Sequence, residues 1–328
     1  MPGGDLSVRV TGRPARQGSG RYVARMVVNP PPPADLPSYI DAYREVLGTF
    51  IGTCDGLREA EWELPTACPG WTVREQVAHV LHIEEQLAGM GQDESGMPQG
   101  GVPEPVEIGA PAHVRNPLGV WTEQGVRALA HLSPAELVAR LREVLQIRSA
   151  QLYSPDLDLD SLVPVIPAGE APLGRIMQLR VSDIWVHGQD IRAAVGRPGA
   201  LDSPGAAAFT AHVLRNLPDI VHEDVAPPPG TVVILESTGP VTGRAGVRIG
   251  TGQDGVSVAH PLFTGRTGEE EERPATDGVE DSVTTIALST HELTRRAAGR
   301  QEVEETAYQV TGDEELARAV LGKLSLTP

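Results

Sequence analysis

One histidine and two aspartates stand in an otherwise largely apolar stretch of the chain, VSDIWVHGQDIRAAVG, at residues 181–196. Asp183 lies four residues before His187, and Asp190 lies three residues after it. Residues three and four apart share one face of a helix, so we expect the three side chains to form a single polar stripe. Because a buried carboxylate without a partner is unfavourable, the stripe requires a metal ion, a basic side chain or water beside it.

A second histidine could complete a metal site with this stripe. His79 lies in the segment TVREQVAHVLH, which has the apolar spacing of a helix. Together with His187 and Asp183 it would supply two imidazole nitrogens and one carboxylate oxygen. This mixed donor set suits zinc or a similar divalent ion, and three protein ligands leave a coordination position open.

The spacing also permits simpler interpretations. An acid four residues before a helical histidine is often only a hydrogen-bonded pair, and a single histidine on a helix is often a core residue. Glu75, His79 and His82 could also pair with one another. We interpret His82 as a solvated residue or as one that contacts a ligand without binding the metal.

Cys68 is the alternative nucleophile. It precedes the N-terminus of the helix that carries His79, where the helix dipole is expected to lower the pKa of a thiol. However, no histidine base is close to Cys68 in the sequence, and a small residue packed beside Trp71 needs no chemical role. Trp71 and Trp185 are interpreted as core residues.

The composition excludes several classes of partner. The chain has 27 Lys and Arg residues against 44 Asp and Glu residues, a net charge of −17, which repels phosphate backbones and anionic membranes. Two cysteines, Cys54 and Cys68, make no disulfide framework and fit a reducing compartment. No apolar run approaches the roughly 18 residues of a transmembrane helix, and no secretory signal pattern is present. We therefore expect a cytoplasmic protein that binds neither nucleic acid nor membranes.

The first two thirds of the chain has the periodicity of helices. Residues 1–34 are Gly-rich and basic, with prolines throughout 30–33, and are interpreted as a disordered tail or as sequence upstream of a true start at Met26. Residues 91–116 are long for a connector and are predicted to form a lid over a site. The expected helices cover about residues 36–54, 73–90, 118–131, 134–152, 172–195 and 204–217.

A change of pattern at residues 226–230, APPPG, marks the predicted domain boundary. Residues 35–225 contain four long helices, which suffice for a bundle. Residues 226–328 alternate short β-branched segments with Gly-rich turns and end in capped helices, which predicts a small α+β domain. The expected strands are TVVILES, AGVRIG, GVSVAH, VTTIALS and EVEETAYQV.

Several motifs, in their order along the chain, resemble the mycothiol-dependent maleylpyruvate isomerase family. They are CPGWTVREQVAHV, HVRNPLG, DIWVHGQDIRAAVGRPG, STHELTRRAAGR and VTGDEELARAVLGKL. The resemblance covers about residues 35–328. It implies a DinB-like four-helix bundle, followed by a sterol-carrier-like α+β domain.

The resemblance also implies roles for individual residues. The metal-binding histidine of the second helix falls on His79, and the later acid and histidine ligands fall on Asp183 and His187, with Asp where the isomerase has Glu. Asp190 is expected to orient His187 or to pair with Arg192. The catalytic arginine that the isomerase takes from its C-terminal domain is assigned here to Arg300.

The resemblance finally implies a chemistry. Zinc or another divalent ion would bind and deprotonate mycothiol, a small thiol of actinobacteria, and the thiolate would add to a small electrophile. Addition followed by elimination gives cis–trans isomerisation, whereas addition alone is a thiol transfer. The alternative function is a non-enzymatic protein that binds a small ligand and carries a structural metal site.

Overall fold

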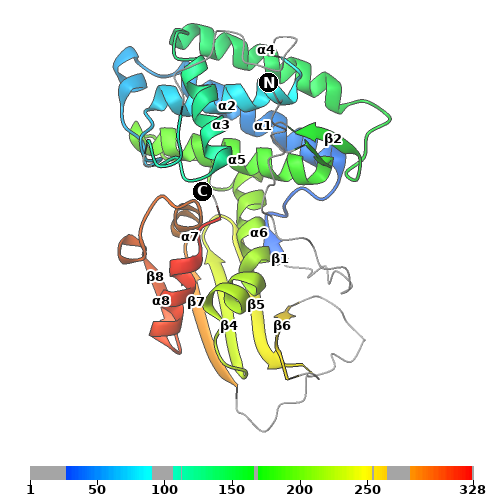
Figure 1. Ribbon diagram of the computed structural model, residues 1–328, viewed down its shortest axis with the longest axis vertical. Helices are drawn as coiled ribbons and strands as arrows, with labels where there is room; N and C mark the ends of the chain where they lie inside the picture. Colours follow the sequence, from blue (N-terminus) through cyan, green and yellow to red (C-terminus); the bar gives the residue numbers. More distant parts are fainter. Residues whose placement is uncertain are drawn as a thin grey trace, which may run out of the picture.

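The computed structural model describes residues 27–90, 106–111, 113–165, 169–252, 255–263 and 281–326. Figure 1 shows two parts along the long axis, one made mainly of helices and the other of a sheet with helices beside it. The described chain is therefore of the mixed α and α+β type that its sequence pattern predicts. Among these residues, no helix combines the length and the apolar character needed to cross a bilayer.

The helical part as described contains five α-helices, and three of them begin with a capping box. Asp35, Thr72 and Ser133 each form a capping box with the residue three positions later, which satisfies the first free N–H groups of the helix. The helices are α1 (Leu36–Asp55), α2 (Val73–Leu87), α3 (Pro117–Ala128), α4 (Pro134–Leu152) and α5 (Leu173–Ala194).

Four of these helices bury their apolar faces against one another. α1 packs on α4 and α5, and α2 packs on α4 and α5 while α3 lies against its outer side. Leu47, Leu81, Leu141 and Ile184, one from each of the four, are completely buried in the shared core. Burial of apolar area is the main force that fixes this arrangement, and it holds α2 and α5 side by side.

The second part is built on a mixed sheet. Its described strands follow the order β1-β5-β4-β7-β8, and β6 pairs with β5 on the same edge as β1, farther along that strand. Of these described pairs, only β4–β7 is parallel. Two short helices, α7 (Thr290–Ala297) and α8 (Glu314–Lys323), complete it. The strands are β1 (Val27–Asn29), β4 (Thr231–Thr238), β5 (Thr242–Thr251), β6 (Ser257–Leu262), β7 (Ser282–Leu288) and β8 (Tyr308–Thr311).

The interpretation of residues 1–34 as a tail is wrong for its last part. Val27–Asn29 pair with Thr242–Arg244 of β5, and Val28 is buried. A strand of three residues is too short for a clear alternating pattern, so these residues carry no recognisable strand signal. Residues 1–26, including the proposed start at Met26, lie outside the described residues.

Helix α6 (Pro204–Asp219) connects the two parts. It contacts α1 and α5 on one side and β5, β6 and α7 on the other, and Figure 1 shows it running along the sheet. It continues into a π-helical segment, Ile220–Val225. The secondary structure thus changes near residues 226–230, as predicted, whereas the packing against the sheet already begins with α6.

Two local features differ from the expected elements. The segment 302–310 was expected to be one strand, but Val303–Glu305 form a short 3-10 helix and only Tyr308–Thr311 join the sheet. The side chain of Glu305 accepts the backbone N–H of Glu302, which closes this turn. In addition, β2 (Leu162–Val165) and β3 (Gly169–Pro172) form a hairpin that the sequence pattern did not indicate.

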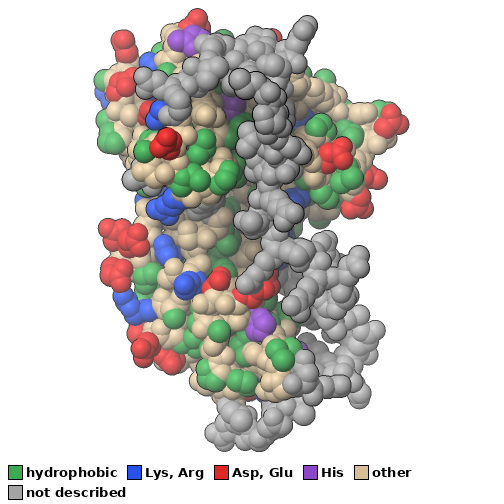
Figure 2. Space-filling view, in the orientation of Figure 1, with side chains coloured by type: hydrophobic (Ala, Val, Ile, Leu, Met, Phe, Trp, Pro, Cys, Tyr) green, Lys and Arg blue, Asp and Glu red, His purple; other side chains and the backbone are tan. Residues whose placement is uncertain are grey.

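The surface agrees with the acidic composition. On the face drawn in Figure 2, Asp and Glu side chains occur on both parts of the molecule, with Lys and Arg side chains between them. The described residues of this face form no continuous basic stripe of the kind that follows a nucleic-acid backbone.

Candidate metal centre

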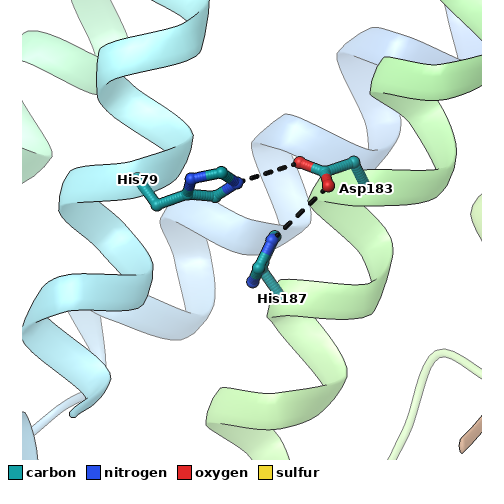
Figure 3. Close-up of side chains that lie close together, drawn as sticks. All are labelled: His79, Asp183 and His187. Carbon is teal, nitrogen blue, oxygen red and sulfur yellow. Dashed lines mark ion pairs between the residues drawn. The ribbon is translucent and has the colours of Figure 1, made fainter. Parts of the chain in front are cut away.

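The candidate site lies between α2 and α5. His79 is on α2, and Asp183 and His187 are one turn apart on α5. Val73, Val77 and Val80 of α2 are fully buried in the core. Figure 3 shows the three polar side chains pointing toward one another across the gap between the two helices.

The distances fit a common centre. Nε2 of His79 lies 3.4 Å from Oδ2 of Asp183, and Nε2 of His187 lies 3.5 Å from Oδ1 of the same carboxylate. One ligand atom from each residue lies within 4.8 Å of the others. Both imidazoles are buried, but the Asp183 side chain keeps 30% of its surface exposed, so the centre is reachable from the side of this carboxylate.

His79 has no hydrogen bond that would account for its position. Within the described part of the chain, neither of its ring nitrogens has a hydrogen-bond partner. Burial, followed by the charge of His187, lowers the pKa of His79 to about 4, so its imidazole is neutral near pH 7. A buried, neutral imidazole with a free lone pair, facing a second imidazole and a carboxylate, fits a divalent metal ion such as zinc.

The charge of Asp183 is held by a buried arginine. Burial alone would raise the pKa of Asp183, but the charges of His187 and Arg180 outweigh it and hold that pKa well below its usual range. Nη1 of Arg180 donates to Oδ2 of Asp183 at 2.8 Å, and its Nε donates to Glu84 at 2.7 Å. Tyr43 donates its hydroxyl to the other oxygen of Glu84 at 2.7 Å.

Two residues of this network are not predicted from the sequence: Arg180, which donates to Asp183, and Glu84, which accepts from Arg180. Arg180 stands three residues before Asp183, so the helical spacing could have indicated it. Glu84 comes from α2, and nothing in its local sequence points to α5.

Trp71 is a buried core residue whose ring also packs against both histidines of the candidate centre. Its ring centroid lies 4.9 Å from that of His79 and 6.1 Å from that of His187. Its indole N–H donates to Glu123 at 3.0 Å, and the same carboxylate oxygen lies 2.9 Å from Nε2 of His113. Trp185 is buried, as predicted.

His82 is not solvated, contrary to one of the expectations. It is buried, and its ring packs against Trp121 with centroids 4.6 Å apart. Burial, and then the charge of Arg180, lower its pKa to about 4. A Cβ at Gly125 would meet the His82 ring, so this glycine provides the space for it.

The expected activation of Cys68 by the helix dipole is also wrong. Burial raises the pKa of the Cys68 thiol to about 11, although the nearby Arg300 lowers it. The thiol is therefore protonated near pH 7. Burial removes the solvation that a thiolate needs, which favours the neutral thiol.

Asp190 and Arg300 lie on the opposite side of His187. Nε of Arg300 donates to both oxygens of Asp190, at 3.2 and 2.9 Å, and both side chains are buried. Oδ2 of Asp190 is 3.9 Å from Nδ1 of His187. Asp190 does not pair with Arg192, whose guanidinium donates to Oγ1 of Thr53 at 2.9 Å.

The predicted lid lies partly outside the structure. Residues 91–105 and 112 are outside the described residues. Of the remainder, Val106 and Val114 are buried, and His113 contacts Glu123.

The model of the mycothiol maleylpyruvate isomerase N-terminal domain family matches residues 43–192. This segment of the chain belongs to that family. The matched segment includes His79, Asp183, His187 and Asp190. Arg300 comes from the sheet part and lies outside the family domain.

Individual similar proteins include two uncharacterized proteins from two strains of Mycobacterium tuberculosis. Each is 29% identical to this chain over 137 residues, which are 41% of this chain and 48% of theirs. The chain thus spans about half the length of these curated relatives.

Two solved structures are also similar, namely crystal structures of the mycothiol-dependent maleylpyruvate isomerase and of a mutant of it. Their sequence identities are 15% and 14%, and their TM-scores are 0.46 and 0.44. The comparisons cover 85% and 84% of this chain and 92% of each of those chains.

Proposed function

We propose that this protein is a metal- and mycothiol-dependent enzyme of the maleylpyruvate isomerase type. His79, Asp183 and His187 hold a divalent ion, for which zinc is the candidate. The substrate is a small electrophile, and the reaction is a cis–trans isomerisation or a thiol transfer. The single observation that carries this proposal is the convergence of the three side chains inside the family domain.

Each ligand is prepared for this role by its surroundings. The low pKa of His79 leaves its nitrogen lone pair free near pH 7, and Arg180 keeps Asp183 anionic. Trp71 packs against both imidazoles, which limits their movement and excludes water from that side. The partly exposed Asp183 side remains the route by which a small thiol and its substrate enter.

A bound divalent ion would supply the positive charge that lowers the pKa of a thiol, which yields a thiolate near pH 7 without a protein cysteine. This agrees with the protonated state of Cys68. In an isomerisation, a C–S bond forms at an activated double bond, the resulting single bond rotates, and elimination breaks the C–S bond again. In a thiol transfer, the adduct instead takes up a proton at the neighbouring carbon.

The family domain also suggests the finer architecture. We propose that residues 35–225 form a DinB-like four-helix bundle and that residues 226–328 form a sterol-carrier-like domain, with the protein acting in the cytoplasm. A role for Arg300 in binding substrate remains a prediction, since its Nε already donates to Asp190 and its Nη1 to the carbonyl of Ala298.

The test measures bound zinc by mass spectrometry and mycothiol-dependent conversion of maleylpyruvate. We expect stoichiometric zinc in the purified protein and a loss of both zinc and turnover in His187→Ala. His212→Ala is the matched control, because His212 is a half-buried histidine of α6 whose ring contacts Gln178 and Asn216.

Full zinc occupancy in the folded His187→Ala variant would overturn the proposed site. Zinc without any mycothiol-dependent turnover of small electrophiles would favour the alternative, a non-enzymatic ligand-binding protein with a structural metal.

A further inference from the structure

A line of buried polar side chains joins the sheet part to one metal-ligand candidate. Nε of Arg300 donates to Asp190, the amide nitrogen of Gln76 donates to Oδ2 of Asp190 at 3.5 Å, and the amide oxygen of Gln76 meets Nδ1 of His187. Asp190, Gln76 and His187 are all buried. The line crosses from the loop after α7, through α5 and α2, and back to α5.

From this line we infer that Gln76 fixes the tautomer of His187 and that Arg300 acts on the metal centre through Asp190 and Gln76. Arg300 is then a positioning residue. The inference rests on the proposed metal site, because it concerns which nitrogen of His187 faces the metal.

The orientation of the Gln76 amide follows from its two other neighbours. A carboxylate has only acceptors, so Asp190 must face the amide nitrogen. Oγ1 of Thr66 gives its single hydrogen to the carbonyl of Trp71 at 2.8 Å. It can therefore only accept from Nε2 of Gln76, which lies 2.7 Å away. Both contacts place the amide nitrogen away from His187 and the amide oxygen toward it.

The tautomer of His187 follows from the amide orientation. The amide oxygen of Gln76 is an acceptor, so Nδ1 of His187 must carry the hydrogen. A neutral imidazole protonated on Nδ1 has its lone pair on Nε2. This is the nitrogen that lies 3.5 Å from Asp183, on the side of the metal centre. Gln76 therefore presents the correct nitrogen before any metal binds.

Arg300 keeps this arrangement in place. Without it, Asp190 would be a buried carboxylate whose only described side-chain partners are the amide of Gln76 and the ring of His187. Such a carboxylate would rotate toward other donors. The acceptor that orients Gln76 would then be lost. A residue of the sheet part thus sets the geometry of a ligand in the family domain.

The first test needs no variant. In the metal-free protein, ¹⁵N NMR of the histidine rings should show His187 protonated on Nδ1 with a bare Nε2. A His187 that carries its proton on Nε2 would overturn the inference directly.

The second test measures zinc affinity of the full chain by competition with a chelator. Gln76→Met has no acceptor for Nδ1 and should bind zinc about 10–100-fold more weakly, the usual cost of losing such a partner. Gln76→Glu keeps an oxygen toward Nδ1 in either protonation state and should stay within a few-fold of the wild type. Gln189→Met is the control, since Gln189 donates to the carbonyl of Gly199 away from the centre.

The third test asks whether Arg300 works through Gln76. Arg300→Lys keeps a positive charge beside Asp190 but loses the planar guanidinium group that donates to it. In an otherwise wild-type protein this change should weaken zinc binding several-fold. In the Gln76→Met background the same change should have no further effect, because residues that act through one network are not additive.

The outcomes separate this inference from the proposed function. A wild-type protein that binds no zinc would refute the metal site itself. A folded Gln76→Met variant with wild-type zinc affinity would refute the role of Gln76 and leave the metal site standing. Additive losses in the double variant would refute the path from Arg300 through Gln76.

Discussion

The two sides of the candidate centre are built differently. On the side of Asp183, Arg180 donates directly to the carboxylate and also to Glu84, which accepts the hydroxyl of Tyr43 as well. All of these residues belong to the helical part. On the side of His187, Arg300 of the sheet part pairs with Asp190, which reaches the imidazole through Gln76 and also lies 3.9 Å from its Nδ1.

The difference separates two tasks. A direct ion pair sets the charge of a ligand, because the arginine stabilises the ionised carboxylate. A neutral amide between an ion pair and an imidazole sets the orientation and tautomer of a ligand, with little change of its charge. The Asp183 side, called the charge side below, therefore sets the charge of a metal ligand. The His187 side, called the geometry side below, sets the orientation and tautomer of a metal ligand.

The largest effect is expected on the charge side. Arg180→Met removes the positively charged partner of Glu84, which is completely buried, and leaves that carboxylate with only the hydroxyl of Tyr43 among the side-chain donors described. We expect a loss of about 3–5 kcal/mol in the free energy of unfolding, measured by urea denaturation of the metal-free protein. The same change should raise the pKa of Asp183 and weaken zinc binding at pH 6 more than at pH 8.

Arg192→Met serves as the control on the same helix, since Arg192 donates to the hydroxyl of Thr53. It should cost about 1 kcal/mol or less. Equal losses in the two arginine variants would show that the buried pair has no special role.

A smaller effect is expected on the geometry side. Asp190→Asn keeps the shape of the side chain but removes the charge that faces Arg300. It also leaves a single acceptor oxygen for both Arg300 and the amide nitrogen of Gln76. Zinc affinity should fall about 10–100-fold, as titration against a chelator would show. The pKa of Asp183 should not change, and a shift of it would mean that the two sides are not separate.

The pH dependence of the free energy of unfolding of the metal-free protein is a second test of the surroundings of Arg180. The pKa of His82, which is near Arg180, is lowered to about 4 in the folded state, whereas the unfolded value is 6.5. Between these values the unfolded chain binds the proton more readily, so stability falls as the pH falls. From pH 7 to pH 5.5 this histidine should account for about 1 kcal/mol.

Thermal unfolding of the wild type and of His82→Gln across this pH range measures that contribution. The variant should lose less stability on acidification than the wild type. If both curves have the same slope, His82 is not the group that titrates.

The smallest effect is expected for a change of the ligand itself. Asp183→Glu lengthens the arm by one methylene group but keeps a carboxylate in a site that is open on this side. We expect bound zinc to remain stoichiometric in mass spectrometry. Loss of the metal would show that Arg180 fixes the carboxylate position too tightly for the longer residue.

Much of the architecture could be read from the sequence, because it depends on local rules. The capping boxes at Thr72 and Ser133 mark the starts of α2 and α4 within one residue, since a cap is a contact between residues three apart. The strands β4, β5, β6 and β7 fall where β-branched residues alternate with Gly-rich turns. The spacing of Asp183, His187 and Asp190 on one helix was predictable for the same reason.

Other features depend on contacts between distant segments. The strand β1 exists because β5 pairs with it, and its three residues carry no periodic signal of their own. His82 became a buried residue because Trp121 and Gly125 of α3 enclose it. The pKa of Cys68 is raised by burial of the thiol, which the local sequence does not show.

The sequence by itself thus determined the helices, the strands and the stripe of α5, because backbone hydrogen bonds and side-chain periodicity act within a few residues. Only the tertiary structure determines which partner each polar residue contacts. Arg300 donates to Asp190, which is 110 residues away in the sequence, and Gln76 contacts His187, which is 111 residues away. The packing of apolar faces determines which segments lie together. A buried polar group then forms a hydrogen bond with a donor or acceptor of the neighbouring segment, because leaving it without a partner is unfavourable.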